Sequence, residues 1–517
     1  MPIASVTGSD KDSHAILFYP RKRESQDLTL VGSLRAPSDH NLGATKLRKL
    51  SPDCVVAISP SGDHLFLTAE GAAELCAGGA TDEMVRADRQ SLFISASPFA
   101  GLGTKRLLKS RQLAKRSTVI NGISLHILVP TLQCGHSCRY CQVSRTLDDE
   151  GHTMLETDLD SACDAIFLSP APALTVEFQG GDPLLRFDLI VRAVQRIEQR
   201  NRIEQRDIRF VVASTLHQLD ESMCDFFRAH RVYLSTSIDG PATLHNRNRP
   251  TPGRDAYERT VAGIALARAL IGEDSVSALM TTTRASLAYP QEIVDEYVRL
   301  GFSEIFIRPL SSYGFAKRNQ ARMGYSVDQF MVFFNAALDR VLWWNRNGTS
   351  IREVYSSILF NKMLSTFDAG YVDLQSPTGA GASVLVYNYD GYVYPCDEAR
   401  MLAEDGDVSL RLGSIAEVDA TISAHPVVLE LQRASMPDEI DGCARCAYHH
   451  FCGANPVDAH AQYGNMFAPV ASTEHCQRHL RLFDSMYLRL RNASDAELDL
   501  FHTWARPASF ESKPCAA

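Results

Sequence analysis

The chain has 517 residues, of which 45% are hydrophobic and 22% charged. This composition is typical of a soluble globular protein, and the length suffices for about three domains. A formal net charge of −9 argues against a protein built mainly to bind nucleic acid. No apolar run approaches the roughly 20 residues that span a membrane, and the start of the chain has neither the basic nor the apolar region of a secretory signal. We therefore expect a cytoplasmic protein.

Cysteine usage points to metal chemistry. Thirteen cysteines are present, and most of them fall into two tight groups. In a reducing compartment such grouping is typical of metal ligation rather than of disulfides. The scattered cysteines are expected to be buried small side chains or incidental thiols.

The N-terminal part predicts a small module. Residues 1–50 are polar and are expected to form a loosely ordered lead-in. Within residues 51–118, the strand-like runs VVAIS and HLFLT flank the turn SPSGD, and AEGAAELCAG has the pattern of a short helix. A hairpin followed by helices is the outline of modules that bind leader peptides, and equally of a plain packing module. Residues 102–116 add a basic helical segment, which is either a solvated face or a contact for a peptide or phosphate.

The central part, residues 119–320, alternates apolar strands with amphipathic helices. Strands are expected at 125–130, 174–179, 208–214, 232–238, 276–282 and 304–310. This alternation predicts an α/β fold, an incomplete (β/α)6 barrel with reacting residues at the carboxyl ends of the strands. Residues 321–378 are expected to form a helical linker. A cysteine-rich domain over 379–480, opening with a hairpin, and a C-terminal helix and tail over 481–517 complete the prediction.

Three cysteines in CGHSCRYC follow the first of these strands. Cys134, Cys138 and Cys141 could hold a [4Fe–4S] cluster by three of its irons and leave the fourth iron open, whereas a closed cluster or a structural zinc usually takes four protein ligands. An open iron can chelate the amino and carboxylate groups of S-adenosylmethionine (SAM).

The second strand ends in a glycine-rich turn, FQGGDPLL. Gly180 and Gly181 would let the backbone approach a ligand closely, and Asp182, before Pro183, could accept hydrogen bonds from an ammonium group. A turn without a ligand is the alternative interpretation.

Later strands end in polar residues as well. Ser237 and Asp239 lie where ribose hydroxyls could bind, and Arg249 lies where a carboxylate could bind. Ser214 is either a weaker ribose candidate or a local strand-end cap. Arg308 either contacts SAM or pairs with a carboxylate of the barrel.

The cysteine triplet with the aromatic Tyr140 before its last cysteine, followed by GGDP and then SIDGP on later strands, resembles the radical SAM superfamily over roughly residues 120–320. The resemblance implies that these residues bind a [4Fe–4S] cluster and SAM. It also implies cleavage of SAM to methionine and a 5′-deoxyadenosyl radical, which abstracts a hydrogen atom from the substrate.

The second cysteine group lies in CARCAYHHFC. Cys443, Cys446 and Cys452, with Cys476 after a gap, could form a four-thiolate site or a zinc ribbon. Together with YNYDGYVYPCD, the tail resembles the SPASM extension of peptide-modifying radical SAM enzymes, which implies an auxiliary [4Fe–4S] cluster. We predict one such cluster on these four thiols, because the cysteines for another are incomplete.

Two neighbouring residues keep open roles. Cys396 is either a structural thiol or a ligand of an open cluster. Asp397 matches the position of a proposed general base in sulfatase-maturing relatives, where a carboxylate could take a proton from the substrate. It could equally cap a turn.

Longer strings, LQCGHSCRYCQVSR, YNYDGYVYPCDEARML and CARCAYHHFCGANPV, resemble the B-type maturase of the His-Xaa-Ser system, although Asn455 departs from that pattern. The resemblance implies oxidative modification of a ribosomally made precursor peptide. It also implies a second radical SAM maturase as partner and a flavodoxin- or ferredoxin-like reductant, with no nucleic acid and no membrane. The alternatives are a sulfatase-type maturase that makes formylglycine, or a non-catalytic iron–sulfur scaffold for a second maturase.

Overall fold

The computed structural model describes residues 45–77, 79, 81–82, 106, 110–111, 113–114, 121–148, 150–366 and 368–506. Its largest sheet has nine strands in the order β10-β8-β7-β6-β5-β4-β12-β13-β14. The six parallel strands that the sequence predicts are present as β4 (Leu125–Thr131), β5 (Ala173–Gly180), β6 (Asp207–Ala213), β7 (Val232–Ser237), β8 (Val276–Thr281) and β10 (Ile307–Arg308). A mixed α/β fold with a parallel sheet is thereby confirmed.

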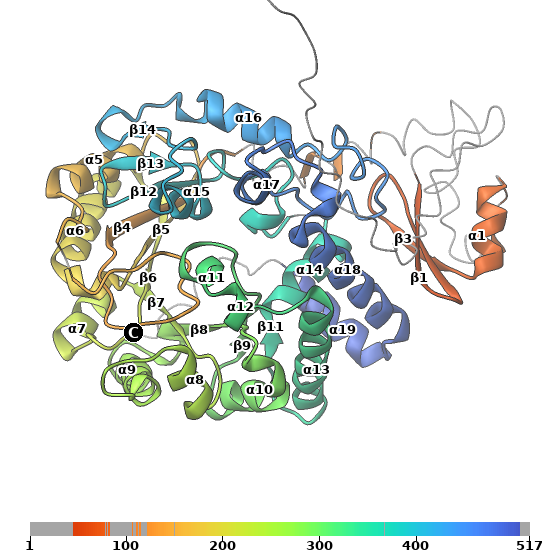
Figure 1. Ribbon diagram of the computed structural model, residues 1–517, viewed down its shortest axis with the longest axis horizontal. Coiled ribbons are helices and arrows are strands. Elements are labelled where there is room, and N and C mark those ends of the chain that lie inside the picture. The colour runs from red at the N-terminus through yellow and green to blue at the C-terminus, as the bar shows by residue number, and fades with distance from the viewer. Residues whose placement is uncertain are drawn as a thin grey trace, which may run out of the picture.

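Amphipathic helices link these strands. They are α5 (Glu156–Ile166), α6 (Phe187–Glu204), α7 (Glu221–Ala229), α8 (Ala242–Asn248), α9 (Ala256–Leu270) and α10 (Pro290–Arg299). In α6, for example, Leu189, Ala193 and Ile197 are buried at intervals of four residues, which places them on one face of the helix. Figure 1 shows α5, α6, α7, α9 and α10 as an arc around the outside of the strands.

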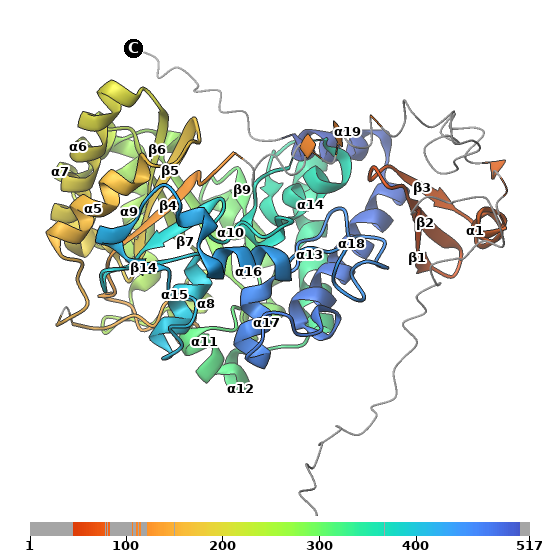
Figure 2. The ribbon, with the colours of Figure 1, turned by 90° about the horizontal axis from the view of Figure 1, so that it is seen from above.

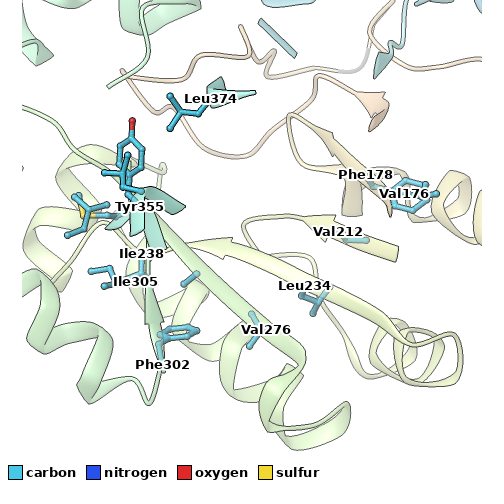
Figure 3. Packing of buried hydrophobic residues seen from close by; sticks show 14 of the residues in the cluster. Val176, Phe178, Val212, Leu234, Ile238, Val276, Phe302, Ile305, Tyr355 and Leu374 are labelled. Carbon is cyan, nitrogen blue, oxygen red and sulfur yellow. The ribbon is translucent and has the colours of Figure 1, made fainter. Parts of the chain in front are cut away.

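Buried apolar side chains fill the space between strands and helices. Val176 and Phe178 on β5, Val212 on β6 and Leu234 on β7 are at most 1% exposed. Figure 3 shows these residues packed side by side across neighbouring strands. Because side chains alternate along a strand, the intervening residue Glu177 points to the opposite face of the sheet.

The C-terminal part continues the same sheet. β12 (Val384–Tyr387) pairs in parallel with β4, and β13 (Tyr392–Tyr394) and β14 (Gly413–Ser414) follow in antiparallel pairing. The expected hairpin at Asp390–Gly391 is present, and Gly391 has a positive φ of 81°. The segment predicted as a cysteine-rich domain therefore shares its sheet with the central segment, residues 119–320, because β12 hydrogen-bonds the edge that β4 leaves open.

The remaining elements are mostly helical. They are β9 (Glu304–Ile305), which pairs with β11 (Arg352–Glu353), and the helices α11 (Gly314–Arg318), α12 (Gln320–Met323), α13 (Val327–Arg346), α14 (Val354–Leu364), α15 (Asp397–Glu404), α16 (Pro426–Ala434), α17 (Pro456–Tyr463), α18 (Glu474–Asn492) and α19 (Asp495–Ala505). Among the residues described, no helix combines the length and the apolar character that a membrane crossing requires.

The N-terminal module is a three-stranded antiparallel sheet with one helix: β1 (Lys46–Ser51), β2 (Cys54–Ile58), β3 (His64–Leu67) and α1 (Ala69–Cys76). Figure 2 shows it at the end of the molecule beyond α18 and α19, far from α5 and α6. β1 begins inside the expected lead-in, where three basic residues among six hide the strand pattern. The rest of the lead-in, residues 1–44, and most of the basic segment at 102–116 lie outside the described residues.

Candidate active site

The cysteine triplet lies on the loop that follows β4. Cys134 and Cys138 are buried and Cys141 is half-buried. Burial, aided by Asp182 and Cys138, raises the pKa of Cys134 above the usual range of a thiol. Burial likewise raises the pKa of Cys138 to about 12, against the opposing charge of Arg249. The three thiols are thus close enough to influence one another, and three converging thiols fit a cluster held by three of its irons.

The two glycines of the GGDP turn lie against the backbone of this cysteine loop. A Cβ atom on Gly180 would overlap the carbonyl oxygen of Thr131, and one on Gly181 would overlap those of Leu132 and Gln133. Gly181 N also donates to Thr131 O at 2.9 Å. The sequence predicted that a ligand would approach the backbone at these glycines. In the structure, the chain that leads into Cys134 makes this close approach.

Asp182 ties the end of β5 to the end of β6. Its Oδ1 accepts from Ser214 Oγ at 2.6 Å and its Oδ2 accepts from the hydroxyl of Thr215. Leu184 N donates to Oδ1 at 3.3 Å, which caps the short 3-10 helix that starts at Pro183. The structure therefore gives Asp182 and Ser214 partners within the protein, and the hydroxyl proton of Ser214 points to Asp182.

Tyr140, Asp239 and Arg249 form a buried polar cluster against the cysteine loop. Tyr140 Oη donates to Asp239 Oδ2 at 2.6 Å, and Arg249 Nε lies 3.4 Å from the same oxygen. The guanidinium of Arg249 also lies over the Tyr140 ring, 5.4 Å from its centroid. Because Tyr140 stands between two of the cysteines, this cluster fixes the cysteine loop. Ser237, the last residue of β7, precedes Asp239 by two residues and is half-buried.

A polar cavity of about 100 Å³ lies between the sheet and the C-terminal helices. Residues from at least four separate segments line it, including Gln142, Arg308, Tyr313, Tyr371, Asp373, Glu398, Asn455, Asp458, His475 and Arg478. Burial opposes the charge of Arg308, but the nearby Tyr371, Asp373 and Glu398 raise its pKa. Arg308 thus has carboxylates near it, and a contact of Arg308 with SAM stays a prediction.

Asp397 and Glu398 differ in their surroundings although they are adjacent. Asp397 Oδ1 accepts from Arg400 Nε at 2.9 Å, and the two side chains form an ion pair. Glu398 instead lines the cavity, and burial, together with Asp373 and Asp397, raises its pKa to about 7. The carboxyl group whose pKa suits proton transfer near neutral pH is therefore that of Glu398.

The tail cysteines gather around one turn and one helix. Cys443 and Cys446 lie in the turn, Cys452 follows, and Cys476 lies in the first turn of α18, where its N–H donates to Thr473 Oγ1 at 3.1 Å. Burial, together with Cys476 and Cys446, raises the pKa of Cys443 to about 12. Four neighbouring thiols supply the number and kind of ligands that a four-thiolate site needs. Within the described ranges, no group of three or more Cys, His, Asp or Glu side chains has the arrangement of a metal-ion site.

Cys396 is the N-cap residue of α15 and belongs to neither cysteine group of the sequence. It is 4% exposed, and its pKa is raised by burial and by Glu398. Sequence reasoning missed Glu398, Asp373 and Arg478 as cavity residues. Of these, only Glu398 had a signal in the sequence, namely its position next to Asp397. Asp373 and Arg478 come from distant segments that packing brings to the cavity.

The central region matches a known protein family. Residues 128–300 match the model of the radical SAM superfamily. The chain contains a radical SAM domain. This agrees with the resemblance read from the cysteine triplet, and it implies a [4Fe–4S] cluster and SAM as cofactors of that domain.

Among curated proteins, an uncharacterised protein of Synechocystis sp. is 30% identical over 178 residues, 33% of this chain and 44% of that protein. The chain thus spans less than half the length of that relative. A cysteine-type anaerobic sulfatase-maturating enzyme of Clostridium perfringens is 22% identical over 286 residues, 53% of this chain and 74% of the enzyme.

Two solved structures share the fold of the radical SAM domain. Native anSMEcpe with bound AdoMet is 17% identical, with a TM-score of 0.61, and the match covers 73% of this chain and 99% of that one. Streptococcus suis SuiB bound to precursor peptide SuiA is 14% identical, with a TM-score of 0.52, covering 83% and 98%. At such identities the likeness establishes the fold.

Proposed function

We propose that this chain is a radical SAM maturase that oxidatively modifies a ribosomally made peptide, and that this peptide carries His-Xaa-Ser repeats. The observation that carries the proposal is one polar cavity lined by a sequence neighbour of each cysteine group. Gln142, which lines the cavity, follows Cys141 directly, and His475, which also lines it, precedes Cys476. A substrate in this cavity lies between the site of radical formation and a site that can accept an electron.

The two cysteine groups take different cofactors in this proposal. Cys134, Cys138 and Cys141 would hold the SAM-binding [4Fe–4S] cluster at the rim of a partial (β/α)6 barrel. Cys443, Cys446, Cys452 and Cys476 would hold one auxiliary [4Fe–4S] cluster in a SPASM-like tail. When bound, the first cluster and SAM supply a carbon radical that removes a hydrogen atom from the substrate.

The side chains of the cavity have three tasks. The tyrosines and the packed helices exclude water, and Arg308 and Arg478 can bind carbonyl or carboxylate oxygens of a peptide. Glu398 is placed to accept the proton that a substrate heteroatom loses as the substrate is oxidised. Asp397, which the sequence suggested for this role, forms an ion pair with Arg400.

The relatives support a peptide substrate. SuiB was solved with a precursor peptide, and an anSMEcpe structure was solved with bound AdoMet and the Kp18Cys peptide. A second radical SAM maturase as partner, a flavodoxin- or ferredoxin-like reductant and a cytoplasmic location complete the proposal. The likeness to the sulfatase-maturating enzyme makes formylglycine formation the second candidate.

The test begins with iron, sulfide and zinc per chain after anaerobic reconstitution. About eight irons, as two four-iron clusters, are expected in the parent chain, and about four in each of Cys138→Ala and Cys446→Ala. Cys224→Ala, which removes a buried cysteine from α7, is the matched control and should keep both clusters.

The activity assay then uses SAM, dithionite and a peptide with His-Xaa-Ser repeats, with and without a partner maturase. The parent should form 5′-deoxyadenosine and change the mass of the peptide, and Cys138→Ala should do neither. Formylglycine on a sulfatase-derived peptide would favour the second candidate. Turnover that needs only the partner's cysteine triplet would identify this chain as a scaffold and overturn the proposal.

A further inference from the structure

Strand β1 of the N-terminal module lies directly against the tail cysteine turn, more than 400 residues away in sequence. Lys46 Nζ lies 2.9 Å from His449 Nδ1, across a sequence separation of 403 residues. Arg48 binds Asp484 of α18 through two hydrogen bonds, Nε to Oδ1 at 2.9 Å and Nη2 to Oδ2 at 2.6 Å. The module is therefore anchored at the tail site by two basic side chains of a single strand.

The groups that hold these side chains belong to the cysteine turn or are hydrogen-bonded to it. Tyr448 N donates to Cys446 Sγ at 3.4 Å, and Tyr448 Oη donates to Asp484 Oδ1 at 2.6 Å. His449 N donates to Cys446 O at 3.3 Å. Lys46 thus contacts His449, three positions after Cys446. Arg48 contacts Asp484, which accepts a hydrogen bond from Tyr448, two positions after Cys446.

The two cations differ in how their charge is balanced. Arg48 forms a close ion pair with the carboxylate of Asp484, so most of its charge is compensated. Lys46 donates instead to an imidazole. An imidazole carries no negative charge, so His449 does not compensate the ammonium. Burial lowers the pKa of Lys46, and Cys446, Asp438 and Cys443 oppose this shift. The side chain of Asp438 is 62% exposed and screened by water.

We infer that Lys46 is a positioning residue of the auxiliary site, whose positive charge favours the reduced state of the cluster that Cys443, Cys446, Cys452 and Cys476 would hold. The inference rests on the proposed function, because it requires that cluster. Four thiolates outweigh the positive charge of a four-iron core, and each added electron makes the site more negative. A nearby cation therefore stabilises the reduced form and raises the reduction potential.

The size of the effect follows from Coulomb's law. A unit charge roughly 10 Å away, at an effective dielectric constant of about 20, changes a one-electron equilibrium roughly tenfold. A tenfold change corresponds to a shift of about 59 mV for a one-electron couple. The N-terminal module thus contributes to the redox chemistry of the tail, whether or not it also binds a leader peptide.

The test is a redox titration of the full-length chain, followed by electron paramagnetic resonance. A Cys138→Ala background leaves the auxiliary cluster as the source of the signal. Lys46→Met should lower the ratio of reduced to oxidised cluster about tenfold at a fixed potential. Lys46→Arg should restore it, and Lys49→Met is the matched control, because Lys49 lies on the same strand with its side chain exposed.

Lys46→Gln is a second variant in case Lys46→Met does not fold, since it keeps a hydrogen-bond donor toward His449 but removes the charge. It should lower the ratio of reduced to oxidised cluster as much as Lys46→Met does. Equal potentials in the parent, Met and Gln variants at equal iron content would overturn the inference. So would an equal shift in Lys46→Arg, which would show that shape and not charge matters. Zinc in place of iron in the parent tail would instead refute the auxiliary cluster of the proposed function, and the inference with it.

Discussion

The cluster of Tyr140, Asp239 and Arg249 makes a sharp prediction about the substitution Asp239→Asn. Asp239 is fully buried, accepts from Tyr140 Oη at 2.6 Å and Thr281 N at 3.3 Å, and lies 3.4 Å from Arg249 Nε. An asparagine keeps the shape and can still accept a hydrogen bond, but it removes the charge. The side chain of Arg249 is only 11% exposed, so its guanidinium would be left as an uncompensated buried cation.

Breaking a buried ion pair in this way costs about 3–5 kcal/mol of the free energy of unfolding. Tyr140→Phe removes only a hydrogen bond to a charged group and should cost about 1.5–3 kcal/mol. The matched control is Asp225→Asn, whose partner is Arg228 and whose side chain is 66% exposed; an exposed pair of this kind contributes about 0–1 kcal/mol. Because Tyr140 lies between Cys138 and Cys141, Asp239→Asn should also lower the iron retained by the triplet.

The assay is urea unfolding of the metal-free chain under anaerobic conditions, followed by iron content after reconstitution. Asp239→Asn, Tyr140→Phe and the double variant form a cycle, and the two single losses should not add, since both residues share one hydrogen bond. If Asp239→Asn costs no more than Asp225→Asn, the cluster does not hold the loop and the reasoning is refuted.

Two further predictions concern the glycine turn and the cavity. Gly181→Ala should reduce the iron bound by the cysteine triplet at least severalfold, because the added Cβ overlaps two carbonyl oxygens of the cysteine loop. The control is Gly135→Ala in the same loop, whose Cβ meets no atom within 4 Å and which should retain iron. Equal iron content in the two variants would contradict this prediction. If Glu398 accepts the substrate proton it must be ionised, so peptide turnover should rise with pH through about 7, and Glu398→Gln should lower it by about 10²–10⁴-fold. Asp397→Asn removes a negative neighbour that raises the pKa of Glu398, so the rise of turnover with pH should move to lower pH. A pH profile that does not move, or full activity in Glu398→Gln, would exclude Glu398 as the proton acceptor.

The strand order and the cysteine motifs could be predicted from local patterns. Five of the six parallel strands lie within one residue of their expected bounds, and β10 lies inside the expected range 304–310, because apolar runs between amphipathic helices are a local signal. The grouping of Cys443 with Cys446 is equally local. The join of β12 to β4 could not be read in this way, since an edge pairing depends on which strand remains open after folding.

Asp397 and Glu398 show where sequence reasoning stops. Both begin α15, and successive residues of a helix point about 100° apart, so one faces Arg400 and the other faces the cavity. The motif locates the pair but does not say which member faces inward. That choice depends on how α15 packs against the sheet.

The sequence by itself determined the chemistry that the chain can carry: a three-cysteine loop after a strand, a GGDP turn, and a four-cysteine tail. The tertiary structure decided the partners of those residues. Only in the folded chain do the glycines meet the cysteine loop, Asp182 bind Ser214, and Lys46 reach His449 across 403 residues. The physical reason is that spacing along the chain fixes short-range geometry, whereas burial and charge compensation are set by residues that only packing brings together.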